Sequence, residues 1–195
     1  MARPREFDED QVLERAMRVF WERGFDGTSV ADLEAATGLV RTSLYGAFGD
    51  KEKLFLRVLD RFGRRYTDFF DKLMTGEPAR AGFEEAFDAW FDMNCQKDGP
   101  RGCLVQLAST TGAADLPRAK ALVHEATLSM DKTFVKALQR AHDRGELRKG
   151  ADVKTLARYL SVTMQGLSSA ARGGKGRKEL QPVVDLMLDT IFGPR

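Results

Sequence analysis

Residues 28–51 hold two short apolar repeats separated by one glycine, and no other stretch constrains the fold of this chain as strongly. The apolar positions recur at helical spacing on both sides of the glycine, at Val30, Leu33 and Ala36 before it and at Leu44 and Phe48 after it. Gly38 permits the tight turn that a β-carbon would obstruct. The stretch therefore predicts a helix-turn-helix, in which two short helices clamp each other through their apolar faces.

The second helix of such a motif can lie in the major groove of DNA, so its outward residues are candidate contacts. We expect Arg41, Thr42, Ser43 and Gly46 to face the bases, with Tyr45, Lys51 and the hydroxyl of Thr28 on phosphates. Arginine can read guanine bidentately and hydroxyls accept several partners, whereas phosphate contacts fix the register without reading sequence. An αα-hairpin that only fills a bundle is the less favoured alternative, because it would not need outward polar residues here.

The motif and its flanks resemble the DNA-binding module of the TetR family of bacterial transcriptional regulators. The residues that carry the resemblance are Gly24-Phe25-Asp26-Gly27-Thr28-Ser29-Val30, Gly38, Ser43-Leu44-Tyr45, Phe48 and Lys51. The matched segment runs from about Arg3 to Leu54 without insertion or deletion. The resemblance supports DNA contacts most directly at Tyr45 and Lys51, while Gly46 stands where relatives often have a large residue.

Two positions depart from the family pattern. Glu34 stands where the family usually has a small residue against the neighbouring helix. Val40 stands where a serine usually precedes the second helix, so the cap of that helix must come from elsewhere.

Composition is that of an ordinary globular protein, with 43% hydrophobic and 31% charged residues in 195. The chain lacks an apolar leader and a run of eighteen apolar residues, so we expect a cytoplasmic protein without a membrane segment. The net charge of +2 is a weak indication of nucleic-acid binding. Cations nevertheless flank the motif at Arg3, Arg5, Arg41, Lys51 and Lys53. The amino-terminal arginines could enter a minor groove, or they could form a disordered solubilising tail.

Helical periodicity and capping residues predict an all-α protein of about nine helices. Asp8 can cap the first helix and Asp50 a long fourth one, with further helices over residues 79–95, from Cys103, from Pro117, over residues 153–167 and over residues 180–192. We expect a helix-turn-helix domain over residues 1–50 and an effector-binding and dimerisation domain over residues 51–195. The fourth helix would act as a lever between them.

The last two helices carry more apolar residues than one buried stripe needs. These residues are Leu156, Leu160, Met164 and Leu167 in the first, and Val183, Leu186, Met187 and Ile191 in the second, beside Thr190. Surplus apolar surface predicts a partner helix pair. The resemblance implies a four-helix dimer interface at this place, and therefore a homodimer on a palindromic double-stranded operator.

The resemblance also implies a small-molecule effector bound in the larger domain. Candidate lining residues are Trp90, Met93, Gln106, Met130, Phe134, Tyr159 and Met164, with Gln106 and Tyr159 as orienting polar groups. For any one of these side chains taken singly, plain core is the favoured interpretation. An effector that displaces the fourth helix would release the protein from its operator. We therefore expect the protein to be a repressor.

Cys103 supports an alternative mode of regulation. It follows Arg101 at an expected helix start, where a cation and amide dipoles would favour a thiolate. Some members of the resembled family sense oxidants or electrophiles through such a cysteine, so Cys103 is also a candidate effector-site residue. In the competing interpretation, Cys103 is a small buried apolar residue. We prefer control of the protein by a ligand to control through this thiol.

Nothing in the sequence predicts catalysis or metal binding. His124 and His142 lie eighteen residues apart on one expected helix, roughly 27 Å along its axis, so they cannot share a metal. No nucleophile motif or phosphate-binding glycine loop is present. We therefore expect a regulator that is not an enzyme and needs no cofactor.

Overall fold

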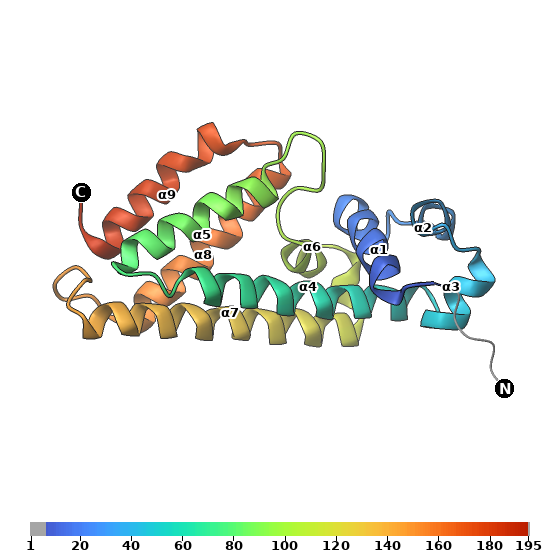
Figure 1. The fold of residues 1–195 in the computed structure, drawn as a ribbon, viewed down its shortest axis with the longest axis horizontal. Coiled ribbons are helices and arrows are strands. Elements are labelled where there is room, and N and C mark those ends of the chain that lie inside the picture. Colours follow the sequence, from blue (N-terminus) through green and yellow to red (C-terminus); the bar gives the residue numbers. More distant parts are fainter. Residues whose placement is uncertain (1–6, 195) are drawn as a thin grey trace.

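The computed structural model describes residues 7–194, and helices joined by turns and loops are the only regular secondary structure over that range (Figure 1). Its helices are α1 (Glu9–Arg23), α2 (Val30–Thr37), α3 (Arg41–Phe48), α4 (Lys51–Leu73), α5 (Ala79–Asn94), α6 (Leu104–Thr110), α7 (Pro117–Asp143), α8 (Val153–Arg172) and α9 (Arg177–Phe192), with a 3₁₀ turn at Gly112–Asp115. The predicted all-α architecture of about nine helices is confirmed. None of these helices is long and apolar enough to cross a membrane. The two amino-terminal arginines, Arg3 and Arg5, lie outside the described residues.

Local capping chemistry sets the helix starts where the sequence predicts them. The carboxylate of Asp8 accepts the main-chain N–H of Asp10 at 2.9 Å, and that of Asp50 accepts the N–H of Lys53 at 2.7 Å. Gly24 ends α1 with a φ of 71°, a left-handed conformation that a β-carbon would strain.

Helices α1, α2 and α3 form one end of the molecule, and α4 runs from them into the larger part, where it lies along α7 (Figure 1). Aromatic pairs bind α4 at both ends: Phe20 of α1 meets Phe55 at 5.1 Å between ring centroids, and Phe134 of α7 meets Phe70 at 6.3 Å. Burying each of these rings contributes on the order of 1.5–3 kcal/mol. One apolar core therefore continues along α4 from the motif to the larger part.

Ion pairs add to the packing of α1 on α4. Arg61 of α4 contacts Asp10 at 2.6 Å and Glu14 at 3.0 Å. Each such surface pair contributes about 0–1 kcal/mol, so the cluster orients α1 more than it stabilises it. The acidic residues of α1 are thus turned toward α4.

The last helix begins at Arg177, earlier than the predicted Leu180. Proline lacks an N–H and is usually confined to the first turn of a helix, which suggested a later start. Pro182 instead lies inside α9 on an exposed turn. The carboxylate of Glu179 accepts the N–H of Gly176 at 3.1 Å and caps the earlier start.

The surplus apolar surface of α8 and α9 also differs from the prediction. Leu160, Met164, Leu167, Met187 and Ile191 are buried within the chain itself. The apolar side chains left exposed are Tyr159 and Val162 of α8 and Val183 and Leu186 of α9, with Val162 62% and Leu186 65% exposed. An apolar face remains on these two helices, but it lies on the opposite side of α8 from the expected stripe.

Candidate DNA-binding face and interior cavity

Helix α3 lies at one end of the molecule (Figure 1). Arg41, Thr42, Ser43 and Gly46 are exposed, whereas the apolar residues of this helix are buried. Tyr45 is half-buried, and the guanidinium of Arg41 lies 5.4 Å from the centroid of its ring. The structure therefore brings together on one face the residues predicted to contact base edges.

The cap of α3 comes from the preceding helix. Val40 offers no side-chain hydrogen bond at this position. The carboxylate of Glu34 in α2 accepts the main-chain N–H of Arg41 at 2.5 Å. The two departures from the family pattern thus compensate each other, since the acid at one position replaces the cap missing at the other.

Gly46 leaves open space on this face. A β-carbon there would meet no heavy atom within 4 Å. The glycine is therefore not required by packing, and it keeps the middle of α3 free of a side chain.

The side chain of Lys51 is bonded to the protein. Its ammonium donates to the carbonyl oxygens of Phe25 at 3.1 Å and Thr28 at 3.0 Å and lies 4.3 Å from the centroid of the Phe25 ring. This half-buried lysine ties the start of α4 to the loop before α2, which favours a structural role over the predicted phosphate contact.

The hydroxyl of Thr28 is also turned inward. It donates to the carbonyl oxygen of Gly24 at 2.6 Å, and the residue is 1% exposed. Because this hydroxyl is buried and hydrogen-bonded to the carbonyl oxygen at the end of α1, it cannot contact a phosphate. This predicted contact is corrected.

A capping box at the start of α2 was missed. Ser29 Oγ accepts the N–H of Asp32 at 3.1 Å, and the carboxylate of Asp32 accepts the N–H of Ser29 at 2.9 Å. Hydrogen bonds from Ser29, together with Arg23, lower the pKa of Asp32 to about 2. The signal was present as Ser-x-x-Asp before an apolar run.

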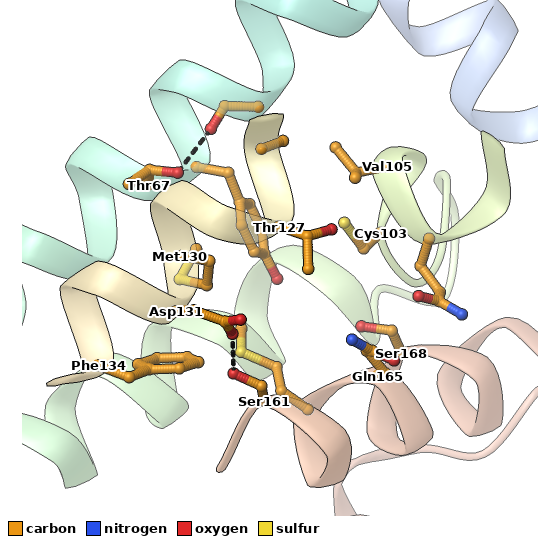
Figure 2. A pocket seen from close by; sticks show the side chains of 15 residues that line it. Thr67, Cys103, Val105, Thr127, Met130, Asp131, Phe134, Ser161, Gln165 and Ser168 are labelled. Atoms are coloured by element: carbon orange, nitrogen blue, oxygen red, sulfur yellow. Dashed lines mark hydrogen bonds between the residues drawn. The ribbon is translucent and has the colours of Figure 1, made fainter. Parts of the chain in front are cut away.

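A cavity of about 80 Å³ lies among α4, α6, α7 and α8 (Figure 2). Of the predicted effector residues, Cys103, Gln106, Met130, Phe134 and Met164 line it. Gly63, Tyr66, Val105 and Ala126 complete its apolar and aromatic wall. The cavity thus borders the helix that leads to the DNA-binding face.

Polar side chains of the cavity were missed by the sequence analysis. They are Thr67, Thr127, Asp131, Ser161, Gln165 and Ser168. Asp131 of α7 and Ser161 of α8 meet in the cavity wall, where the serine hydroxyl donates to the carboxylate (Figure 2). These residues interrupt apolar stripes at helical spacing, which is the only trace that they leave in the sequence.

Three predicted effector residues lie elsewhere. Trp90 is fully buried in the core, and its indole N–H has no hydrogen-bond partner. Met93 lines a separate groove beside α1, where Trp21 and Phe62 also lie. Tyr159 precedes Ser161 by two residues, which turns it about 200° around α8 and onto the outer surface.

Cys103 is the N-cap of α6, as predicted, but its environment does not favour a thiolate. Burial raises the pKa of this thiol to about 11, and hydrogen bonds from the main chain of Gln106 and Val105 offset this only in part. The guanidinium of Arg101 is engaged with the carbonyl oxygens of Gln96 and Gly174, at 2.9 and 3.0 Å. The predicted lowering of the thiol pKa is therefore wrong.

A hydrogen-bonded bracket joins α1 to the part of the chain that lines the cavity. The guanidinium of Arg172, at the end of α8, donates to the carbonyl oxygens of Trp21 at 2.8 Å and Glu22 at 2.9 Å. The indole N–H of Trp21 donates to the carbonyl oxygen of Gly102 at 2.6 Å. Because Gly102 precedes Cys103, and Ser168 lies one turn before Arg172, the bracket adjoins the cavity wall.

Comparison with known proteins agrees with this geometry. Residues 12–58 match the model of bacterial regulatory proteins of the tetR family, and residues 82–186 match a tetracyclin repressor-like C-terminal domain. The HTH-type transcriptional repressor ComR of Escherichia coli strain K12 is 32% identical over 95% of this chain and 90% of its own length. The repressor AcnR of Corynebacterium glutamicum is 28% identical over 93% of this chain and 90% of its own.

Among solved structures, a cysteine mutant of the TetR family regulator CifR, complexed with 26-bp operator DNA, superposes with a TM-score of 0.86. It is 32% identical, and the match covers 97% of this chain and all of that one. These matches, together with the outward α3, identify the chain as a helix-turn-helix transcriptional regulator. The chain belongs to the TetR family of bacterial regulatory proteins.

Proposed function

We propose that the protein is a repressor that binds a palindromic operator as a homodimer and is released from it by a small-molecule effector. The observation that carries this proposal is the exposed polar face of α3, with Arg41, Thr42, Ser43 and Gly46 on its outer side. Relatives of similar length are named repressors, and a similar protein has been solved on operator DNA. Its place of action would be the cytoplasm, where bacterial DNA lies.

The proposed division of labour follows the helices. Residues 1–50 would form the DNA-binding domain, and residues 51–195 the effector-binding and dimerisation domain. Asp50, the cap of α4, marks the boundary. In this division Arg41 and the exposed hydroxyls of Thr42 and Ser43 would read bases. The ring of Tyr45 would hold the guanidinium of Arg41 in place and lie near the phosphate backbone of the DNA.

The exposed apolar side chains of α8 and α9 support a dimer. Val162, Val183 and Leu186 are all more than two-fifths exposed, and Tyr159 extends the same face of α8. Pairing this surface with its copy about a twofold axis would remove apolar area from water. The same axis would relate two α3 helices, which gives the operator its palindromic symmetry.

The cavity supports control by a ligand. Gln106, Met130 and Phe134 remain candidate effector contacts, whereas Trp90, Met93 and Tyr159 are no longer proposed. A ligand pressing on α6 or α8 would strain the Arg172 bracket, and one pressing on α4 would tilt the helix that carries the motif. Either change would favour a second conformation in which the two α3 helices no longer match the operator.

Thiol-based sensing receives no comparable support. A thiol with a pKa of about 11 is almost wholly protonated at neutral pH and is a poor nucleophile. Cys103 is accordingly proposed as part of the cavity wall.

Selection of bound duplexes from a random pool tests the proposal. The expected product is a palindrome bound by a species that sediments as a dimer, and compounds that enter the cavity should release it. Enrichment of asymmetric sequences by a monomer would contradict the dimeric reading, and failure to enrich any sequence would contradict the operator.

A further inference from the structure

The cavity among α4, α6, α7 and α8 is lined by one charged side chain, the carboxylate of Asp131 (Figure 2). It accepts a hydrogen bond from the hydroxyl of Ser161. It forms no ion pair with any lysine, arginine or histidine within residues 7–194. The cavity therefore carries a negative charge that the described protein does not neutralise.

Groups around this carboxylate suit a cation with an apolar body. The fully buried ring of Phe134 lies on α7 one turn beyond Asp131, and the ring of Tyr66 enters the wall from α4. The faces of aromatic rings attract cations electrostatically. The thioethers of Met130 and Met164 complete a polarizable apolar surface that can adapt to a ligand.

Size and access limit the ligand. A cavity of about 80 Å³ exceeds the space that one water molecule needs, yet it excludes large ligands unless the helices move apart. The side chain of Gln165 is exposed, so this part of the wall opens to solvent. The ligand is thus a small molecule.

We propose that the cavity binds a small organic cation, a protonated amine on an apolar body about the size of one ring. Asp131 would pair with the ammonium group, while Phe134, Met130 and Met164 would enclose the body. This inference names the chemical class of the effector and rests on the proposed function for its effect on DNA. An anionic ligand is disfavoured because the carboxylate would repel it.

Three probes that share one ring test the charge preference: benzylamine, benzyl alcohol and benzoate, titrated calorimetrically into the full-length protein at pH 7. We expect benzylamine to bind at least tenfold more tightly than benzyl alcohol, and benzoate to bind most weakly. Asp131→Asn keeps the size of the side chain and an acceptor for Ser161. It should abolish the preference for the amine while changing the affinity for benzyl alcohol less than twofold, which also reports that the cavity remains folded. Asp143→Asn, at the exposed end of α7, is the matched control and should bind as wild type does.

Three results would overturn the proposal: equal binding of the amine and the alcohol, a preference that survives in Asp131→Asn, or no binding of any probe. A measurement of DNA release distinguishes failure of the proposed ligand class from failure of the proposed control by an effector. Release of selected DNA by a neutral compound, without amine preference, would remove the ligand class and leave effector control standing. Charge-selective binding that never releases DNA would confirm the ligand class and remove its role as effector.

Discussion

The carboxylate of Glu34 caps α3 through the main-chain N–H of Arg41, with 2.5 Å between oxygen and nitrogen. The same contact fixes the first turn of α3 to α2. Because Arg41 is also the first exposed residue of α3, the direction in which its side chain leaves the helix depends on an acid one helix away.

Removing this cap should therefore affect both stability and DNA binding. We expect Glu34→Ala to lower the free energy of unfolding by about 1 kcal/mol, the usual cost of losing a cap, and to weaken operator binding. Glu34→Gln keeps an acceptor oxygen and should lose less of both. Urea unfolding and fluorescence anisotropy measure the two effects; wild-type values for Glu34→Ala would show that the contact is not a functional cap.

Lys51 provides a sharper distinction between structure and DNA contact. Lys51→Met keeps the aliphatic stem but leaves the carbonyl oxygens of Phe25 and Thr28 without their charged donor, so we expect a loss of about 1–3 kcal/mol in unfolding free energy. The salt dependence of DNA binding should stay unchanged, because no phosphate contact is lost. Lys53→Met, at a largely exposed lysine, is the control and should leave stability unaltered. A reduced salt slope with unaltered stability in Lys51→Met would restore the phosphate role.

The Arg172 bracket should hold the end of α1. In Arg172→Met, the carbonyl oxygens of Trp21 and Glu22 lose their donor, and hydrogen exchange of amides at the end of α1 should accelerate by about tenfold. Amides in the middle of α4 should keep their protection. Lys154→Met, on the exposed side of the same α8, should leave α1 unchanged. Unaltered exchange in Arg172→Met would mean that packing alone positions α1.

The state of the Cys103 thiol can be titrated directly in a Cys95→Ser background. Absorbance of the thiolate should rise with a midpoint near pH 11, and alkylation at pH 7.5 should be at least tenfold slower than for an exposed cysteine. Since the folded-state pKa is raised, burial of the neutral thiol stabilises the fold below about pH 8.5. That contribution should be lost as pH rises toward 11. A midpoint below pH 8 would reinstate the redox interpretation.

Much of the fold follows from local signals. Asp8 and Asp50 cap their helices because capping needs only a carboxylate beside its own helix start. The bend at Gly38 is similarly local, since a φ of 75° is a conformation that glycine adopts readily. Such features depend on neighbours within a few residues, so a sequence is enough to predict them.

The site was harder to predict because its side chains choose between partners that are distant in the chain. Lys51 could reach either solvent or the carbonyl oxygen of Thr28, 23 residues earlier, and only the packing of α4 decides between them. Asp131 was not among the predicted residues, because only the position of α8, which places Ser161 opposite it, makes it part of the cavity. The predicted cavity position of Tyr159 was wrong for the same reason. The sequence does not show which way α8 is rotated about its axis, and that rotation decides whether a side chain faces the cavity or the surface.

Fluorescence anisotropy of a labelled, selected operator titrated with Arg41→Ala tests most directly whether α3 reads DNA. We expect this variant to lose about 1–3 kcal/mol of binding free energy on the selected duplex and much less on an unrelated duplex, because a base contact is lost. Lys149→Ala removes an exposed cation in the loop between α7 and α8, which lies at the end of the molecule away from α3 (Figure 1), and should bind as wild type does. Wild-type affinity for both duplexes in a folded Arg41→Ala protein would contradict the assignment of α3 as the DNA-reading helix.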